Sequence, residues 1–143
     1  MPSAFHVTFA SRLKSILSQG VVPGKKRIWS NAVGVPLGER GRIYFSLTMA
    51  AALRWAMRQS WEFRDEAKAD PVVIVEFKCP EQVEADAQPG NVMHSGHEDW
   101  RTSRSPIPAA DIIRIIPFSH EQLGALLAAE REQSAQAEAA AQA

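Results

Sequence analysis

The sequence predicts a single α+β domain, because short apolar strands alternate with segments of helical periodicity along a chain of single-domain length. The chain has 143 residues, of which 45% are hydrophobic, including four Trp and six Phe. This hydrophobic share is enough to build one core, and a chain of this length is too short for two full domains. We expect the domain to span residues 1–131, with residues 132–143 as an Ala-, Gln- and Glu-rich tail.

Four segments in the first half of the chain have clear local patterns. Residues 4–8 predict a strand, and a helix is predicted to begin at the N-cap Ser11 and to end at Gly20. Residues 21–41 are rich in Pro and Gly and predict a loop. Residues 42–46 predict a second strand.

A second helix is predicted to follow this strand. Thr48 is placed to cap it, and apolar side chains recur at helical spacing after the cap. These side chains are Leu53, Ala56, Met57 and Trp61. We expect them to face the core.

The second half of the chain predicts a buried strand, a loop and two further strands. Residues 72–77 are β-branched and almost continuously apolar, which is typical of a central strand buried on both faces. Residues 81–97 are polar and predict a loop, whereas residues 98–102 and 111–116 predict strands.

The C-terminal segment predicts a capped helix that frays. Ser119 and Gln122 match a capping box, and Leu123 and Leu126 follow at helical spacing. Beyond Glu130 there are no large apolar residues, so we expect the helix to fray into a solvated tail.

Charge and cysteine usage restrict the classes of function. Sixteen basic and sixteen acidic residues give a formal net charge of zero, so no global field draws the protein onto nucleic acid or anionic membrane. A single cysteine, Cys79, cannot form an internal disulfide, and at the end of a buried strand it is expected to be inert. No apolar run approaches the ~20 residues of a membrane helix. We expect a cytoplasmic protein with no membrane partner.

His6 and Thr8 form an unusual polar pair on the first predicted strand. Positions two apart in a strand point to the same face, so the two side chains can offer hydrogen bonds to one ligand while Phe5 and Val7 enter the core. A core histidine bonded to a backbone carbonyl is the alternative structural reading. With Thr8 beside it and Tyr44 downstream, we favour ligand binding by His6.

The order of three motifs resembles the ADP-ribosyltransferase superfamily. The motifs are His6-Val7-Thr8, the Tyr44-Phe45-Ser46 strand that precedes a helix, and a late acidic residue, and the likeness covers most of residues 4–117. The opening is similar to DNA-targeting DarT-like and small phage- or toxin-type members, and the middle is similar to rifamycin-modifying members. Val7 departs from the glycine that many relatives have after the histidine.

The resemblance implies a split, mostly antiparallel sheet with flanking helices, and NAD as co-substrate. It further implies that His6 binds a ribose hydroxyl, that Tyr44 stacks on nicotinamide, and that Ser46 helps to hold the adjacent strand and the dinucleotide. The implied reaction is a glycosyltransferase step that moves ADP-ribose to a macromolecular acceptor, protein or nucleic acid, in a toxin or phage effector. A carboxylate must stabilise the positive charge that develops on the ribose.

Four residues compete for the role of this carboxylate. Glu98 is favoured because it precedes the last predicted strand pair, and Asp99 is its direct rival. The rifamycin-modifying type places the acid earlier, which points to Glu84 or Asp86.

Three other features carry weaker expectations. Arg27 lies in a basic cluster beside Trp29 and binds either the NAD pyrophosphate or a nucleic-acid backbone, or is simply solvated. His94 and His97 with Glu98 and Asp99 lack the spacing of known metal motifs, so we expect no metal. The rival functions are a catalytically weak binding module or inhibitor of this fold and an RNA 2′-phosphotransferase-like enzyme.

Overall fold

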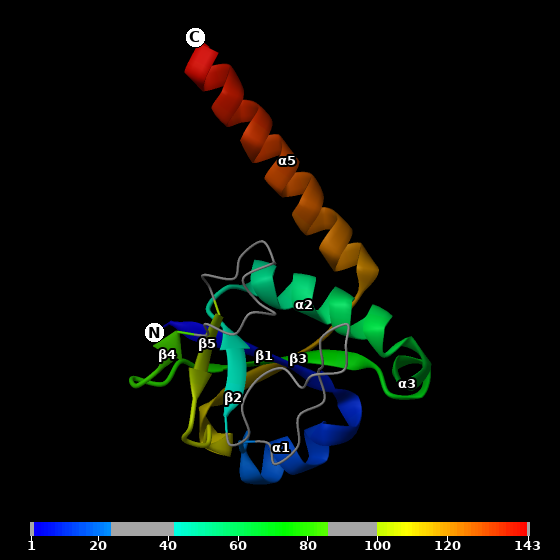
Figure 1. Ribbon diagram of the computed structural model, residues 1–143, viewed down its shortest axis with the longest axis vertical. Helices are drawn as coiled ribbons and strands as arrows, with labels where there is room; N and C mark the ends of the chain where they lie inside the picture. The colour runs from blue at the N-terminus through cyan, green and yellow to red at the C-terminus, as the bar shows by residue number, and fades with distance from the viewer. Residues whose placement is uncertain (1, 24–41, 86–99, 143) are drawn as a thin grey trace, which may run out of the picture.

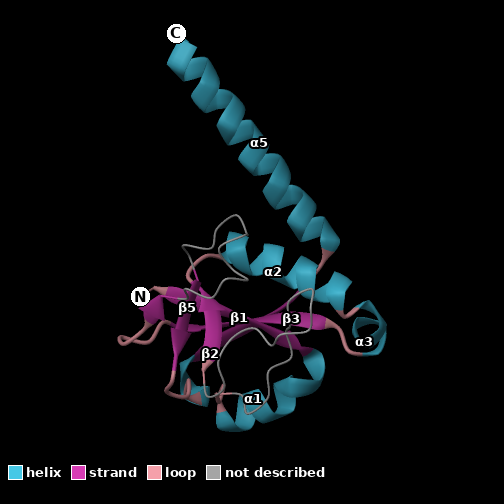
Figure 2. Ribbon diagram, viewed as in Figure 1, coloured by secondary structure: helices cyan, strands magenta, loops and turns pink. Residues whose placement is uncertain are grey.

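The computed structural model describes residues 2–23, 42–85 and 100–142 and has an α+β architecture (Figure 1). Within these residues, six strands form one sheet, and helices cover both of its faces (Figure 2). The strands are β1 (Ser3–Phe9), β2 (Ile43–Ser46), β3 (Val72–Lys78), β4 (Glu84–Ala85), β5 (Trp100–Ser103) and β6 (Ile112–Pro117). The helices are α1 (Leu13–Gln19), α2 (Met49–Glu62), α3 (Arg64–Ala69) and α5 (His120–Gln142), with short 3-10 turns at Ala10–Arg12 and Ala109–Asp111.

The sheet consists of two halves that meet along a very short seam. The strand order is β4-β5-β2-β1-β3-β6, and every neighbouring pair is antiparallel. Seven residue pairs join β1 to β3 and four join β2 to β5, whereas β1 and β2 share only the pair Phe5↔Ser46. The halves β4-β5-β2 and β1-β3-β6 therefore diverge on leaving that pair, which we call the seam.

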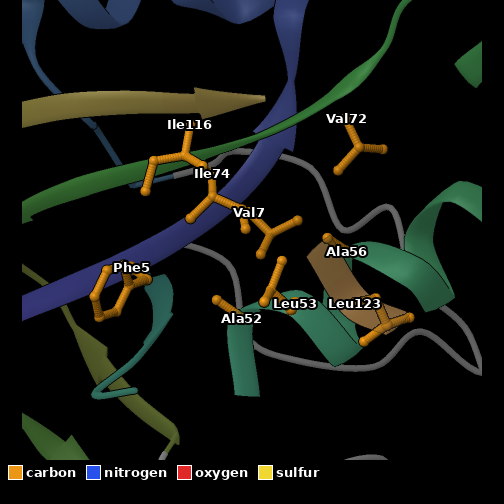
Figure 3. Packing of buried hydrophobic residues seen from close by; sticks show 9 residues of the cluster. All are labelled: Phe5, Val7, Ala52, Leu53, Ala56, Val72, Ile74, Ile116 and Leu123. Atoms are coloured by element: carbon orange, nitrogen blue, oxygen red, sulfur yellow. The ribbon is translucent and has the colours of Figure 1, made fainter. Parts of the chain in front are cut away.

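Two hydrophobic clusters lie on opposite faces of the sheet. On one face, α2 packs through Ala52, Leu53 and Ala56 against side chains of β1 and β3, and Leu123 of α5 completes the cluster (Figure 3). On the other face, Ile16 of α1 contacts a cluster that includes Ala4, Phe45, Val75 and Phe77. The strand predicted over residues 72–77 is confirmed, since each of these six residues is buried.

Local cap predictions are confirmed at three positions and wrong at one. Thr48 caps α2, because its Oγ1 accepts from the Ala51 N–H at 3.3 Å, and Ser119 accepts from the Gln122 N–H at 3.1 Å. Gly20 ends α1 as predicted, and its φ of +83° with a ψ of −174° is a conformation that glycine adopts without steric cost. Ser11 is not an N-cap. It lies in a 3-10 turn, and its hydroxyl donates to the Asp70 carboxylate at 2.6 Å.

The predicted apolar face of α2 is wrong at its C-terminal half. Met57 is 42% exposed and Trp61 is 69% exposed, whereas Gln59 is buried. Each step of four residues turns a helix by 400°, which is 40° more than a full turn. The series Leu53, Met57, Trp61 therefore rotates away from the sheet. The buried positions of α2 are instead Ala51, Ala52, Leu53, Ala56 and Gln59.

The remaining differences concern the edges of the fold. β4 lies inside the segment predicted as a loop, and the strand predicted over 98–102 is observed as Trp100–Ser103. The strand predicted over 111–116 is the edge strand β6, with Ile113 56% exposed. α5 does not fray after Glu130 but continues as one helix to Gln142 and projects from the domain (Figure 1).

Candidate functional site

His6 lies on β1 next to the seam, and its ring makes a defined hydrogen bond. Its Nδ1 is 2.8 Å from the backbone oxygen of Tyr44 on β2. A carbonyl oxygen only accepts, so Nδ1 carries the proton. Burial lowers the pKa of His6, the bond to Tyr44 opposes this, and the charge of Arg12 adds to the lowering. The imidazole is therefore neutral at pH 7, with Nε2 as a hydrogen-bond acceptor.

The bond from His6 to a backbone carbonyl is the structural role given above as the alternative to ligand binding. It uses Nδ1 alone, so Nε2 can still bind a ligand. The Nδ1 bond spans two strands that share no ladder beyond the seam, so it ties the two half-sheets together. The side chain of His6 is only half-buried. A neutral ring fixed through one nitrogen presents the other nitrogen in a set direction, which is how a histidine orients a hydroxyl.

Thr8 lies on the same face of β1 as His6, as the strand period requires. It is 6% exposed and lies opposite Val73 on β3. Thr8 therefore offers little surface to a ligand, and His6 is the more accessible member of the pair.

The structure brings His6 to the backbone of Tyr44 and not to its ring. Ile43 and Phe45 point into the cluster on the α1 face, where the Phe45 ring packs edge-to-face on Phe77 at 5.3 Å. Alternation along β2 then directs Tyr44 and Ser46 to the opposite face. The imidazole of His6 and the phenol of Tyr44 therefore lie on opposite faces of the sheet, close to the seam.

Ser46 is fully buried, and its hydroxyl donates to the Thr48 carbonyl oxygen at 2.7 Å. This bond connects the end of β2 to the start of α2. The bond is local, between positions 46 and 48, and is not made to an adjacent strand. The buried side chain of Ser46 offers no surface to a dinucleotide.

A polar row crosses the outer half-sheet on the face of Tyr44. Thr102 of β5 is the register partner of both Tyr44 and Glu84, so the three residues lie in line across β2, β5 and β4. Arg42 forms an ion pair with Glu84 and also donates to Thr102 Oγ1 at 3.2 Å. The hydrogen bond and the charge of Arg42 lower the pKa of Glu84, which is ionised at neutral pH.

Glu84 is thus the one proposed catalytic acid that falls within the described residues, and it is on the same face as Tyr44. The other proposed acids, Asp86, Glu98 and Asp99, lie outside the described residues, as does Arg27. His94 and His97 lie outside them as well. Cys79 is half-buried, and burial raises the pKa of its thiol, which opposes formation of a nucleophilic thiolate.

A groove between α2, α3 and the start of α5 was missed by the sequence reasoning. It has a volume of about 1040 Å³, and three of the four Trp of the chain line it. The lining includes Trp55, Arg58, Trp61 and Arg64, which repeat at intervals of three residues. That alternation of Trp and Arg is the sequence signal that could have revealed the groove, because residues three apart on a helix are neighbours.

No protein-family model matches the sequence, and neither a curated protein nor a solved structure matches the chain. Among the described residues, no helix combines the length and the apolar character needed to cross a bilayer.

Proposed function

We propose that the protein is an NAD-dependent ADP-ribosyltransferase that transfers ADP-ribose to a macromolecular acceptor. The observation that carries the proposal is the His6 imidazole at the seam. It is neutral, tied to the Tyr44 carbonyl through Nδ1, and oriented with Nε2 as an acceptor. A ribose hydroxyl is the type of donor that such a nitrogen binds. The antiparallel sheet divided at one residue pair supports the same proposal.

We assign the nicotinamide end of NAD to the region beside the seam, where β1 and β2 meet. In this proposal the Nε2 of His6 accepts from a hydroxyl of the nicotinamide ribose on the α1 face. The Tyr44 ring lies on the other face, so its stacking on the nicotinamide requires β1 and β2 to part beyond the seam, where the bond from His6 to the Tyr44 carbonyl joins them. Offset stacking of an aromatic ring on a flat heterocycle contributes about 0.5–1.5 kcal/mol beyond area burial. These two contacts fix the bond that breaks.

The reaction breaks the bond between the ribose C1′ and the nicotinamide nitrogen. The bonding electrons leave with nicotinamide, a positive charge develops on the ribose, and a nucleophile of the acceptor forms the new bond to C1′ and loses its proton. A carboxylate near the ribose stabilises this charge. We assign this role to Glu98, with Asp99, Glu84 and Asp86 as the alternatives. Glu84 is already neutralised by Arg42, which weakens its electrostatic contribution.

The test combines NAD binding and transfer. Titration calorimetry of the full chain should detect NAD binding, and His6→Ala and Tyr44→Ala should each weaken it about tenfold or more, since each removes a hydrogen bond or a stacking ring. His120→Ala is the matched control, because His120 is an exposed histidine on α5. Equal NAD affinity in wild type and in both folded variants would show that His6 and Tyr44 do not bind NAD.

Incubation with NAD labelled on the adenylate, with and without cell lysate, tests the activity itself. Label on protein or on nucleic acid supports transfer to a macromolecule. Label only in free ADP-ribose points to hydrolysis, and a protein that neither binds nor consumes NAD is the binding module that the sequence left as a rival.

A further inference from the structure

The backbone connects the strands more extensively within each half of the sheet than between the halves. Four residue pairs join β2 to β5 and two join β4 to β5 in the outer half-sheet, β4-β5-β2. Seven pairs join β1 to β3 and five join β3 to β6 in the inner half-sheet, β1-β3-β6. Among the described residues, Phe5↔Ser46 is the one pair between the halves, so few backbone hydrogen bonds oppose their separation.

The inner half-sheet has a hydrophobic core of its own. The cluster drawn in Figure 3 contains side chains of β1, β3, β6, α2 and α5, and none of its described members comes from β2, β4 or β5. Ile74 of β3 is fully buried in this cluster. The core of the inner half-sheet therefore does not depend on the presence of the outer half-sheet.

The outer half-sheet buries its large apolar side chains against the inner half-sheet and α2. Phe45 packs edge-to-face on Phe77 of β3, with ring centroids 5.3 Å apart, and the Trp100 ring of β5 lies 5.3 Å from that of Trp55 on α2. Phe45 and Trp100 are both buried. Burial of these rings makes the closed arrangement the stable one, but apolar contacts are non-directional and do not fix strand positions as a ladder does.

We propose that the outer half-sheet opens as one cooperative unit while the inner half-sheet and its core stay folded. Proteins open locally in such units, and the units with the fewest supporting contacts open at the lowest free energy. The hydrogen bond between His6 Nδ1 and the Tyr44 carbonyl oxygen, at 2.8 Å, crosses from one half to the other and stabilises the closed arrangement. Opening breaks this bond together with the pair Phe5↔Ser46.

The opening also controls the orientation of His6. The Nδ1 bond fixes the direction of Nε2, so the ring is oriented only while the outer half-sheet is closed. The equilibrium between the closed and open arrangements therefore sets the fraction of molecules in which Nε2 is oriented toward a ligand. This consequence holds for any ligand of His6 and does not rest on the proposed function.

The test is hydrogen exchange of the full chain, followed by mass spectrometry in the absence of NAD. Amides of the β2–β5 ladder should exchange together, and about tenfold or more faster than amides of the β1–β3 ladder, which exchange on global unfolding. β5 and β3 are matched by position, because each has a neighbouring strand on both sides within its half-sheet. A difference between these two strands is therefore not the fraying of a sheet edge.

Two variants separate opening of the outer half-sheet from global unfolding. His6→Ala removes a bond that both processes break, so it should speed exchange in both ladders about fivefold. Ile74→Val shortens a side chain that stays packed when the outer half-sheet opens. It should speed exchange of the β1–β3 ladder about fivefold and leave the β2–β5 ladder unchanged.

Three outcomes would overturn the proposal. They are equal exchange rates in the two ladders, equal acceleration of both ladders by Ile74→Val, and no acceleration of the β2–β5 ladder by His6→Ala. The first two would show that the sheet unfolds as a single unit, and the third that the His6 bond does not hold the halves together. Since NAD is absent from the exchange experiment, failure here leaves the calorimetric test of NAD binding unaffected, and the reverse also holds.

Discussion

His6 is the residue whose protonation should couple stability to pH. Burial lowers its pKa in the folded chain below the ordinary value of 6.5, so the unfolded chain binds more protons as the pH falls through that value. Stability is therefore complete above about pH 6.5 and decreases below it, by at most about 1.4 kcal/mol per pH unit from this group. His6→Asn keeps a donor for the Tyr44 carbonyl but does not titrate.

The measurement compares urea unfolding of wild type and His6→Asn at pH 7.5 and 5.5. Wild type should lose more stability between the two pH values than the variant does. His120→Asn, which changes an exposed histidine, should behave as wild type does. Parallel pH dependence in wild type and His6→Asn would show that another group controls acid stability.

The catalytic acid is the second prediction at the level of single residues. Glu98→Gln should preserve NAD affinity and reduce transfer about 100-fold or more, because a charge aimed at the transition state affects turnover more than ground-state binding. Asp99→Asn and Glu84→Gln are the comparisons, and turnover and NAD affinity are measured for all three. Loss of transfer in Glu84→Gln with an active Glu98→Gln would assign the reaction to the Tyr44 face of the outer half-sheet.

Gly20 and Gly124 form a matched pair at the level of helices. A Cβ on Gly20 would lie 2.0 Å from the Ile107 oxygen, and its φ of +83° disfavours other residues. Gly20→Ala should thus destabilise the domain by about 2–4 kcal/mol. Gly124 lies inside α5 with no atom within 4 Å of an added Cβ, so Gly124→Ala should stabilise by about 0.5–1 kcal/mol. Thermal unfolding of the two variants checks both signs.

Elements with local determinants could be predicted from the sequence. The run of β-branched residues in β3 and the caps at Thr48 and Ser119 need only their neighbours along the chain. The Ser11 prediction failed because its hydroxyl is bound by Asp70, 59 positions away. The outward turn of Trp61 follows from the rotation of α2 on the sheet, which depends on small residues at Ala52 and Ala56.

At the scale of the whole molecule, the sequence predicts which residues share a strand but not how strands meet. Because side chains two apart in a strand share a face, the sequence correctly predicts that His6 and Thr8 lie on the same face of β1. The face on which Tyr44 falls relative to His6 depends on the register Phe5↔Ser46, and this pairing bridges 40 residues of chain that no local pattern spans. The groove was missed for a related reason, since α2, α3 and α5 create it only after packing.

The projecting end of α5 sets the boundary of the domain. Glu130 forms an ion pair with Arg54 of α2, whereas residues 131–142 are exposed throughout. Deleting residues 132–143 retains that ion pair and should leave the melting temperature and NAD binding nearly unchanged, while the helical circular dichroism signal falls. A solvated helix contributes little to the stability of a domain. A decrease of more than about 5 °C, equivalent to roughly 1–2 kcal/mol, would mean that this helix packs against a second copy.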